Sequence, residues 1–165
     1  MQILMQRLIE TAATKPVLIF AYGNPSRGDD ALGPELLQRL AEKIRRSDLH
    51  SRVELLTDFQ LQIEHTLDME NRQQVVFADA SIKPEKAFSF SRLEGKKDVS
   101  YSSHAMSPES LLNLFQQLHP HDSAEVFLLA IRGYRFDLGQ PLTQQAEINL
   151  EQAVDYLYQR LVFTP

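Results

Sequence analysis

Three short apolar runs, each followed by polar or turn-forming residues, constrain the fold of this chain more than any other feature. The runs are Pro16–Tyr22, Gln74–Asp79 and Val126–Ile131. Continuous apolar runs of this length are typical of strands that are buried on both faces of a sheet. Arg52–Leu56 indicates a further strand. Ala87–Leu93 alternates apolar and polar residues, which favours an edge or antiparallel strand.

Segments with helical periodicity separate these strands. Apolar residues recur at intervals of three and four over residues 36–44, 111–118 and 146–161. Ser107-Pro108-Glu109 is a typical helix start, with a capping serine, a proline in the first turn and an acid near the positive end of the helix. Ile63–Met69 indicates a further, short helix. The expected order is therefore βαβαββαβα, which predicts a three-layer α/β/α sandwich.

Composition and charge narrow the possible functions. The chain of 165 residues contains no linker or repeat, so we expect one domain over residues 1–165. The absence of cysteine excludes disulfides, thiolate metal sites and cysteine nucleophiles. The net charge of −5 and the lack of a basic patch make nucleic acid an improbable partner. No stretch reaches the roughly 20 apolar residues that cross a bilayer, and no signal peptide is evident, so we expect a cytoplasmic protein.

Three polar side chains are expected at the edge of the sheet where ligands bind in open α/β folds, beyond the carboxyl ends of the strands. Asp30 follows the first strand beside Asp29, Asp79 ends the third, and His104 lies in the loop before the helix that starts at Ser107. Two carboxylates and an imidazole suit a borderline divalent ion such as zinc or nickel, with positions open for a substrate.

Each of these residues also has a structural interpretation. One of Asp29 and Asp30 could cap the first helix, Asp79 could brace a loop, and a hydrogen-bonded structural histidine is the commoner explanation for His104. His65, which lies near Glu64, could be a secondary site residue, but a surface position is the favoured interpretation. The sequence contains no dinucleotide-binding loop, P-loop, nucleophile elbow or His-Glu-x-x-His helix.

The first loop resembles a known motif. Gly23-Asn-Pro-Ser-Arg-Gly-Asp-Asp-Ala-Leu-Gly-Pro34 is similar to the N-terminal motif of the nickel–iron hydrogenase maturation endopeptidases. The resemblance continues through Val75-Val-Phe-Ala-Asp-Ala80, Ser103-His-Ala-Met106 and Phe127-Leu-Leu-Ala-Ile-Arg-Gly133, and it covers nearly the whole chain. Ala31 departs from the pattern, because many relatives carry glycine there.

The resemblance implies a twisted, mostly parallel five-stranded sheet and a hydrolase activity. These proteases remove the C-terminal extension of a hydrogenase large-subunit precursor after nickel insertion. The metal-contacting and catalytic set of the family maps onto Asp30, Asp79 and His104. The resemblance also implies that the nickel belongs to the substrate precursor, so no tightly bound cofactor of the protease is expected. Substrate contacts are expected from Gly23, Asn24, Asp29, Gln60 and Glu64.

The segment Thr57-Asp-Phe-Gln-Leu61 departs from the glycine-rich turn of many members. It resembles a subgroup that serves soluble NAD-linked bidirectional hydrogenases. Two other functions stay open from the residues alone. One is a self-contained metal-dependent hydrolase, and the other is a non-catalytic nickel-binding maturation chaperone.

Overall fold

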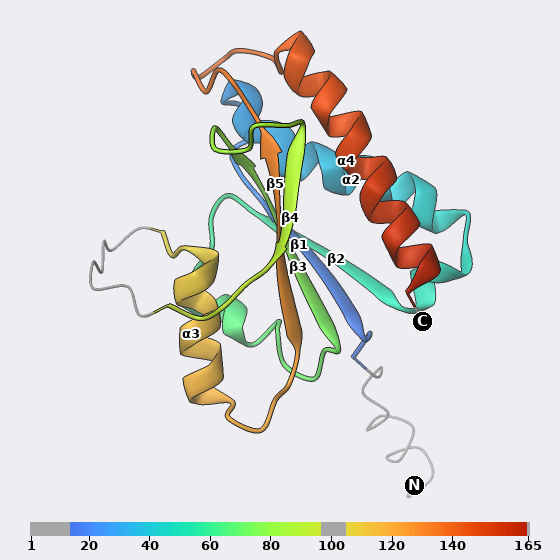
Figure 1. Ribbon diagram of the computed structural model, residues 1–165, viewed down its shortest axis with the longest axis vertical. Helices are drawn as coiled ribbons and strands as arrows, with labels where there is room; N and C mark the ends of the chain where they lie inside the picture. Colours follow the sequence, from blue (N-terminus) through green and yellow to red (C-terminus); the bar gives the residue numbers. More distant parts are fainter. Residues whose placement is uncertain (1–13, 97–104, 165) are drawn as a thin grey trace, which may run out of the picture.

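The computed structural model describes residues 14–96 and 105–164, and in this part of the chain five strands form one sheet in the order β2-β1-β3-β5-β4 (Figure 1). The first four strands in this order run parallel, and β4 runs antiparallel to β5 at one edge. The mostly parallel sheet and its antiparallel edge strand are thus confirmed. The strands are β1 (Val17–Tyr22), β2 (Val53–Asp58), β3 (Gln74–Ser81), β4 (Phe88–Arg92) and β5 (Glu125–Arg132).

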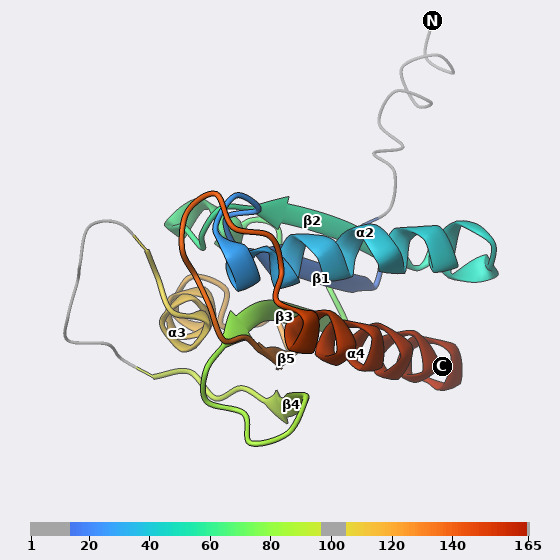
Figure 2. The ribbon, with the colours of Figure 1, turned by 90° about the horizontal axis from the view of Figure 1, so that it is seen from above.

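Helices cover both faces of the sheet. Figures 1 and 2 show α2 (Leu32–Arg45) and α4 (Gln144–Phe163) side by side on one face and α3 (Pro108–Leu118) on the other. The Ser107 hydroxyl accepts the N–H of Ser110 and so caps α3 as expected. No helix in the described part of the chain is both long enough and apolar enough to cross a bilayer.

Each face of β1 packs against a different hydrophobic core, which explains its unbroken apolar sequence. Ile19 and Ala21 pack into the core under α2 and α4. Leu18, Phe20 and Tyr22 pack into the core under α3. All five are less than a tenth exposed. Strand β1 therefore contributes to the packing of both outer layers.

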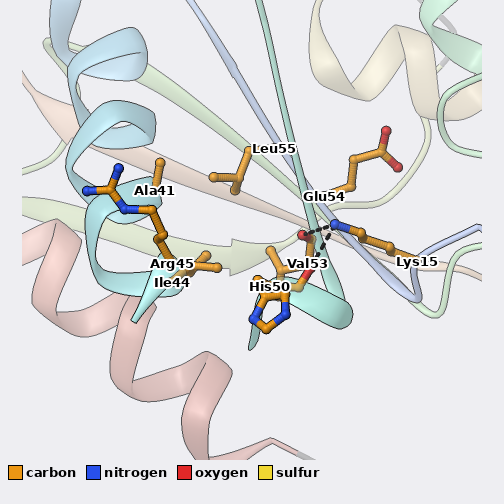
Figure 3. Close-up of a pocket in the computed structure, with 8 residues that line it drawn as sticks. All are labelled: Lys15, Ala41, Ile44, Arg45, His50, Val53, Glu54 and Leu55. Atoms are coloured by element: carbon orange, nitrogen blue, oxygen red, sulfur yellow. Dashed lines mark hydrogen bonds between the residues drawn. The ribbon is translucent and has the colours of Figure 1, made fainter. Parts of the chain in front are cut away.

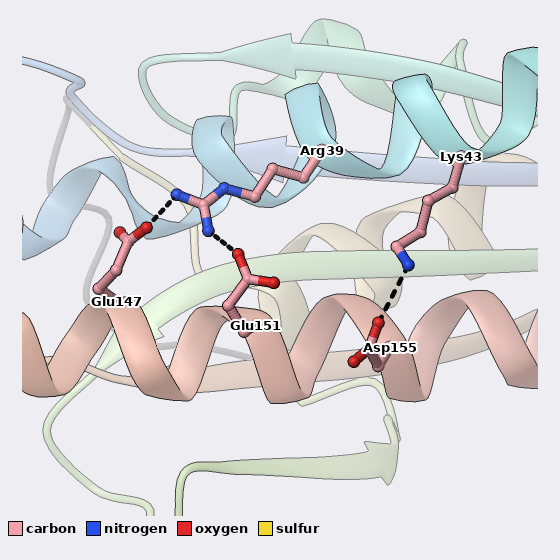
Figure 4. Close-up of polar contacts among 5 residues, drawn as sticks. All are labelled: Arg39, Lys43, Glu147, Glu151 and Asp155. Carbon is pink, nitrogen blue, oxygen red and sulfur yellow. Dashed lines mark hydrogen bonds and ion pairs between the residues drawn. The ribbon is translucent and has the colours of Figure 1, made fainter.

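Helices α2 and α4 also exchange ion pairs along their exposed flanks (Figure 4). Arg39 pairs with Glu147 and Glu151, and Lys43 pairs with Asp155 at 3.1 Å. Because these carboxylates are about half exposed, each pair contributes about 1 kcal/mol or less. The apolar core between the helices and the sheet carries most of the packing energy.

The segment 63–69 differs from the predicted short helix. It contains only the 3₁₀ turn η3 (Ile63–Thr66), followed by further turns. Ile63 and Leu67 are 55% and 67% exposed, so the segment has no buried apolar stripe to support a longer helix. The second helix of the expected order is therefore replaced by a tight turn.

The strand order places a topological switch between β1 and β3. After β1 the chain forms α2 on one face of the sheet, whereas after β2 it crosses to β3 along the other face through η3, which packs against α3. The connections diverge between these two strands, and in open α/β sheets ligands bind beyond the carboxyl ends of the strands at such a point.

Candidate active site

Asp30 and Asp79 lie at this switch point. Asp30 belongs to η1 (Gly28–Ala31), the 3₁₀ turn between β1 and α2, and its Oδ2 accepts the N–H of Asn24 at 2.7 Å. Asp79 lies near the end of β3. Neither Asp29 nor Asp30 caps α2, because its N-cap position is Ala31 and no side chain bonds there. Asp30 is therefore available at the edge of the sheet.

The environment of Asp79 favours its neutral form. Burial raises the pKa of the Asp79 carboxyl to about 7, and the charge of Asp30 acts in the same direction. A hydrogen bond from the Tyr22 hydroxyl opposes the shift. Burial and the charge of Asp79 raise the pKa of Tyr22, so its phenol stays protonated and donates. A cation bound between the two carboxylates would offset this cost and favour ionised Asp79.

Asp29 has a different role from its neighbour. It is fully buried, and its carboxylate accepts the backbone N–H groups of Tyr134, Arg135 and Thr143 and the Thr143 hydroxyl, at 2.7–3.1 Å. Burial disfavours the charge, but these hydrogen bonds outweigh it and lower the pKa of Asp29. No surface is left for a substrate. The expected substrate contact of Asp29 is therefore corrected to a bracing role that joins η1 to the loop after β5.

Gly23 and Asn24 shape the loop that presents Asp30. Gly23 has a φ of +147°, which L side chains rarely adopt, and a Cβ at this position would collide with the carbonyl oxygen of Asp30. The Asn24 side chain accepts the N–H of Ser26 at 2.9 Å. Both residues lie beside Asp30, so they fix its position, and their contact with a substrate stays a prediction.

The loop after β2 approaches the same edge of the sheet. Gln60 in this loop is half-buried, and Glu64 in η3 is exposed. His65 is only 9% exposed, so its expected surface position is wrong. The loop thus places a buried histidine against Asp58 at the end of β2, beside the candidate site.

His104 lies outside the described residues. Two positions later, the N–H of Met106 bonds to the carbonyl of Leu61 at 3.2 Å, and Met106 packs against the core under α3. The segment that follows His104 is therefore anchored at the carboxyl edge of the sheet. Within residues 14–96 and 105–164, no three histidine, aspartate or glutamate side chains form a metal-ligand set.

A separate groove of about 560 Å³ lies at the amino-terminal half of β2 (Figure 3). Its lining includes Lys15, Ile44 and Leu55, and the Lys15 ammonium group is bonded to the carbonyl of His50 at 2.7 Å. None of the expected site residues lines it. The groove and the candidate active site are therefore distinct features at opposite ends of β2.

The chain shares its fold with several solved structures of hydrogenase maturation proteases. The chain is similar to the nickel–iron hydrogenase maturation protease HycI from Thermococcus kodakarensis KOD1, with a TM-score of 0.67, 16% identity, and coverage of 96% of this chain and 99% of that one. It is similar to the hydrogenase maturating endopeptidase HybD from E. coli, with a TM-score of 0.63, 20% identity, and coverage of 88% and 91%. For the maturation protease HybD from Thermococcus kodakarensis the values are 0.60, 21%, 88% and 98%.

The sequence matches no protein-family model and no curated protein sequence. The likeness to the solved structures nevertheless spans nearly their whole length. The chain therefore has the fold that the resemblance of its motifs implied, an α/β/α sandwich around a five-stranded, mostly parallel sheet.

Proposed function

We propose that this protein is an endopeptidase that removes the C-terminal extension of a nickel–iron hydrogenase large-subunit precursor after nickel insertion. The observation that carries the proposal is the pair of carboxylates, Asp30 and Asp79, at the switch point of a sheet with the maturation-protease fold. The likeness in fold supports a protein of this type, and the acidic pair supplies side chains that could contact the nickel ion of the precursor. The partner is the precursor, and the reaction takes place in the cytoplasm.

Nickel enters this scheme as part of the substrate. Asp30, Asp79 and His104 would contact the ion carried by the precursor and leave its other positions to the precursor's own ligands. Without a cation, mutual repulsion and burial disfavour the doubly charged pair, which weakens the docking of an empty precursor. A loaded precursor compensates both carboxylates. The acidic pair would thereby recognise whether nickel is present before the tail is cut.

Site-directed variants test the role of the acidic pair. Asp79→Asn keeps a hydrogen-bond acceptor for Tyr22 but removes the charge, so we expect it to stop cleavage of the nickel-loaded precursor. Asp155→Asn, which removes an exposed carboxylate on α4, is the matched control and should cleave normally. Intact mass of the precursor measures both. Normal cleavage by Asp79→Asn would contradict the proposal.

Metal analysis separates this function from the alternatives. The proposed protease should be purified without stoichiometric metal and should cleave only the precursor. A self-contained metal-dependent hydrolase should keep its ion and act without a hydrogenase subunit. A nickel-binding chaperone should bind the loaded precursor and leave its mass unchanged.

A further inference from the structure

His65 is a buried histidine whose two ring nitrogens are both engaged. Its ring lies against Phe20, with centroids 4.5 Å apart. Its Nδ1 lies 2.9 Å from the backbone nitrogen of Gln62 and accepts that N–H, so Nδ1 carries no proton. The proton of the neutral ring is therefore on Nε2, which donates to Oδ2 of Asp58 at 3.2 Å. The surroundings thus select one tautomer and one ring orientation.

The first partner of His65, Asp58, ends β2 beside the candidate site. Asp58 is in register with Tyr22 on β1, and Tyr22 bonds to Asp79. The three side chains lie on the α3 face of the sheet, because Leu56, Phe20 and Phe77, each two residues earlier on its strand, pack into that core. Two strand spacings separate the backbones of Asp58 and Asp79 by roughly 10 Å.

Asp58 has little freedom to move within this row. Its Oδ1 accepts the N–H of Phe59 at 2.6 Å, and its Oδ2 accepts the proton of His65. Its side chain is nevertheless 37% exposed. It therefore presents a fixed, accessible carboxylate at the same edge as Asp30 and Asp79.

The second partner of His65 leads to the segment that follows His104. The peptide group between Leu61 and Gln62 gives its N–H to His65, and its carbonyl oxygen accepts the N–H of Met106. One peptide plane thus connects the histidine ring to the chain entering α3. His65 thereby joins the end of β2 to the chain that enters α3.

We propose that His65 is a positioning residue for the candidate active site. With one ring it fixes the Asp58 carboxylate and the peptide that anchors Met106, and so sets the distance between two edges of the candidate site, the end of β2 and the start of α3. The proposal rests on the proposed function and adds a specific requirement to it. A substrate held between these edges should be cleaved slowly when either contact of the ring is lost.

A second histidine provides a matched control. His119 at the end of α3 also faces a carboxylate, with its Nε2 3.5 Å from Glu70 Oε1, and its ring also lies against a phenylalanine, Phe115, with centroids 5.1 Å apart. It touches neither Asp58 nor the peptide that anchors Met106. His119→Ala therefore reports what the loss of a comparable packed histidine does to stability alone.

Two conservative variants separate the contacts of His65. His65→Gln places an amide N–H near the position of Nε2 and keeps the donor to Asp58, but it loses the acceptor for Gln62. His65→Asn places an amide oxygen near Nδ1 and keeps that acceptor, but it loses the donor to Asp58. The measurements are kcat and KM on nickel-loaded precursor, the Tm, and hydrogen exchange of the Met106 amide.

We expect both variants to lower kcat/KM about tenfold or more, as the loss of supporting groups around a site commonly does. His119→Ala should keep the wild-type kcat/KM even though its Tm falls as much as that of the His65 variants, or more. Exchange of the Met106 amide should accelerate in His65→Gln and stay slow in His65→Asn. Wild-type kcat/KM in either His65 variant, or unchanged Met106 exchange in His65→Gln, would overturn the proposal.

The exchange measurement also keeps the two proposals distinguishable. If the wild-type protein fails to cleave a loaded precursor, the proposed function is wrong, and Met106 exchange still decides whether His65 positions this segment. If the wild type cleaves and the His65 variants match it, the proposed function stands and the role of His65 is refuted.

Discussion

The raised pKa of Asp79 predicts that Asp79→Asn stabilises the metal-free protein, and increasingly so as the pH rises. The carboxyl ionises near its ordinary pKa of 3.8 in the unfolded chain but near 7 in the folded one, chiefly because it is buried. Between these values the folded state binds more protons than the unfolded state. The free energy of unfolding of the wild type therefore falls as the pH rises from about 4 to about 7.

The two pKa values differ by about 3 pH units, and each unit corresponds to about 1.4 kcal/mol. The raised pKa thus lowers the free energy of unfolding by about 4 kcal/mol above pH 7, by about 2 kcal/mol at pH 5, and by almost nothing below pH 4, a cost of keeping Asp79 buried. Asparagine does not ionise and still accepts the Tyr22 hydrogen bond. The variant should therefore escape this cost at every pH.

Urea denaturation followed by circular dichroism, in the presence of a chelator, measures the effect at pH 5, 6, 7 and 8. The free energy of unfolding of Asp79→Asn minus that of the wild type should rise by about 2 kcal/mol across this range. Asp155→Asn, at an exposed carboxylate, should give a flat profile. If the difference in free energy of unfolding between Asp79→Asn and the wild type is constant, or falls with rising pH, Asp79 does not carry a buried charge that Asp30 repels.

Two other substitutions test the support of the site. Asp29→Asn should lower the free energy of unfolding by about 3 kcal/mol at pH 7, because it removes a buried charge that accepts four hydrogen bonds. Since the pKa of Asp29 is lowered, this loss should shrink as the pH falls below the ordinary value of 3.8. Urea denaturation at several pH values measures both effects. Gly23→Ala forces a side chain against the carbonyl of Asp30, so it should cost about 1–3 kcal/mol and displace that carboxylate. Processing of the precursor by Gly23→Ala should fall with the stability, and wild-type processing would show that the position of Asp30 is not critical.

The sheet could be predicted from the sequence because burial on both faces leaves a signature in each strand. The run Val17–Tyr22 needs apolar residues at odd and even positions, since each set meets a different core. The antiparallel strand β4, at the edge of the sheet, alternates instead and was predicted from that alternation. Strand β2 lies at the other edge and was predicted as a strand without its position in the sheet.

The roles of individual polar residues could not be predicted in the same way. Asp29 and Asp30 are adjacent, and only the folded chain shows that Asp29 turns inward to N–H groups more than 100 positions away. The partner of His65 is likewise set by where β2 ends and η3 begins, so its sequence neighbours gave no indication of burial. The ends of the predicted strands indicate Asp30 and Asp79 as candidates, whereas tertiary hydrogen bonds determine the roles of neighbouring residues such as Asp29.

The most direct test of the proposed function is the mass of the cognate precursor after incubation with the protein, with nickel present or absent in otherwise identical samples. The account predicts that the loaded precursor loses a C-terminal peptide and that the empty precursor keeps its full mass. Equal cleavage of both samples, or no cleavage of the loaded one, would contradict it.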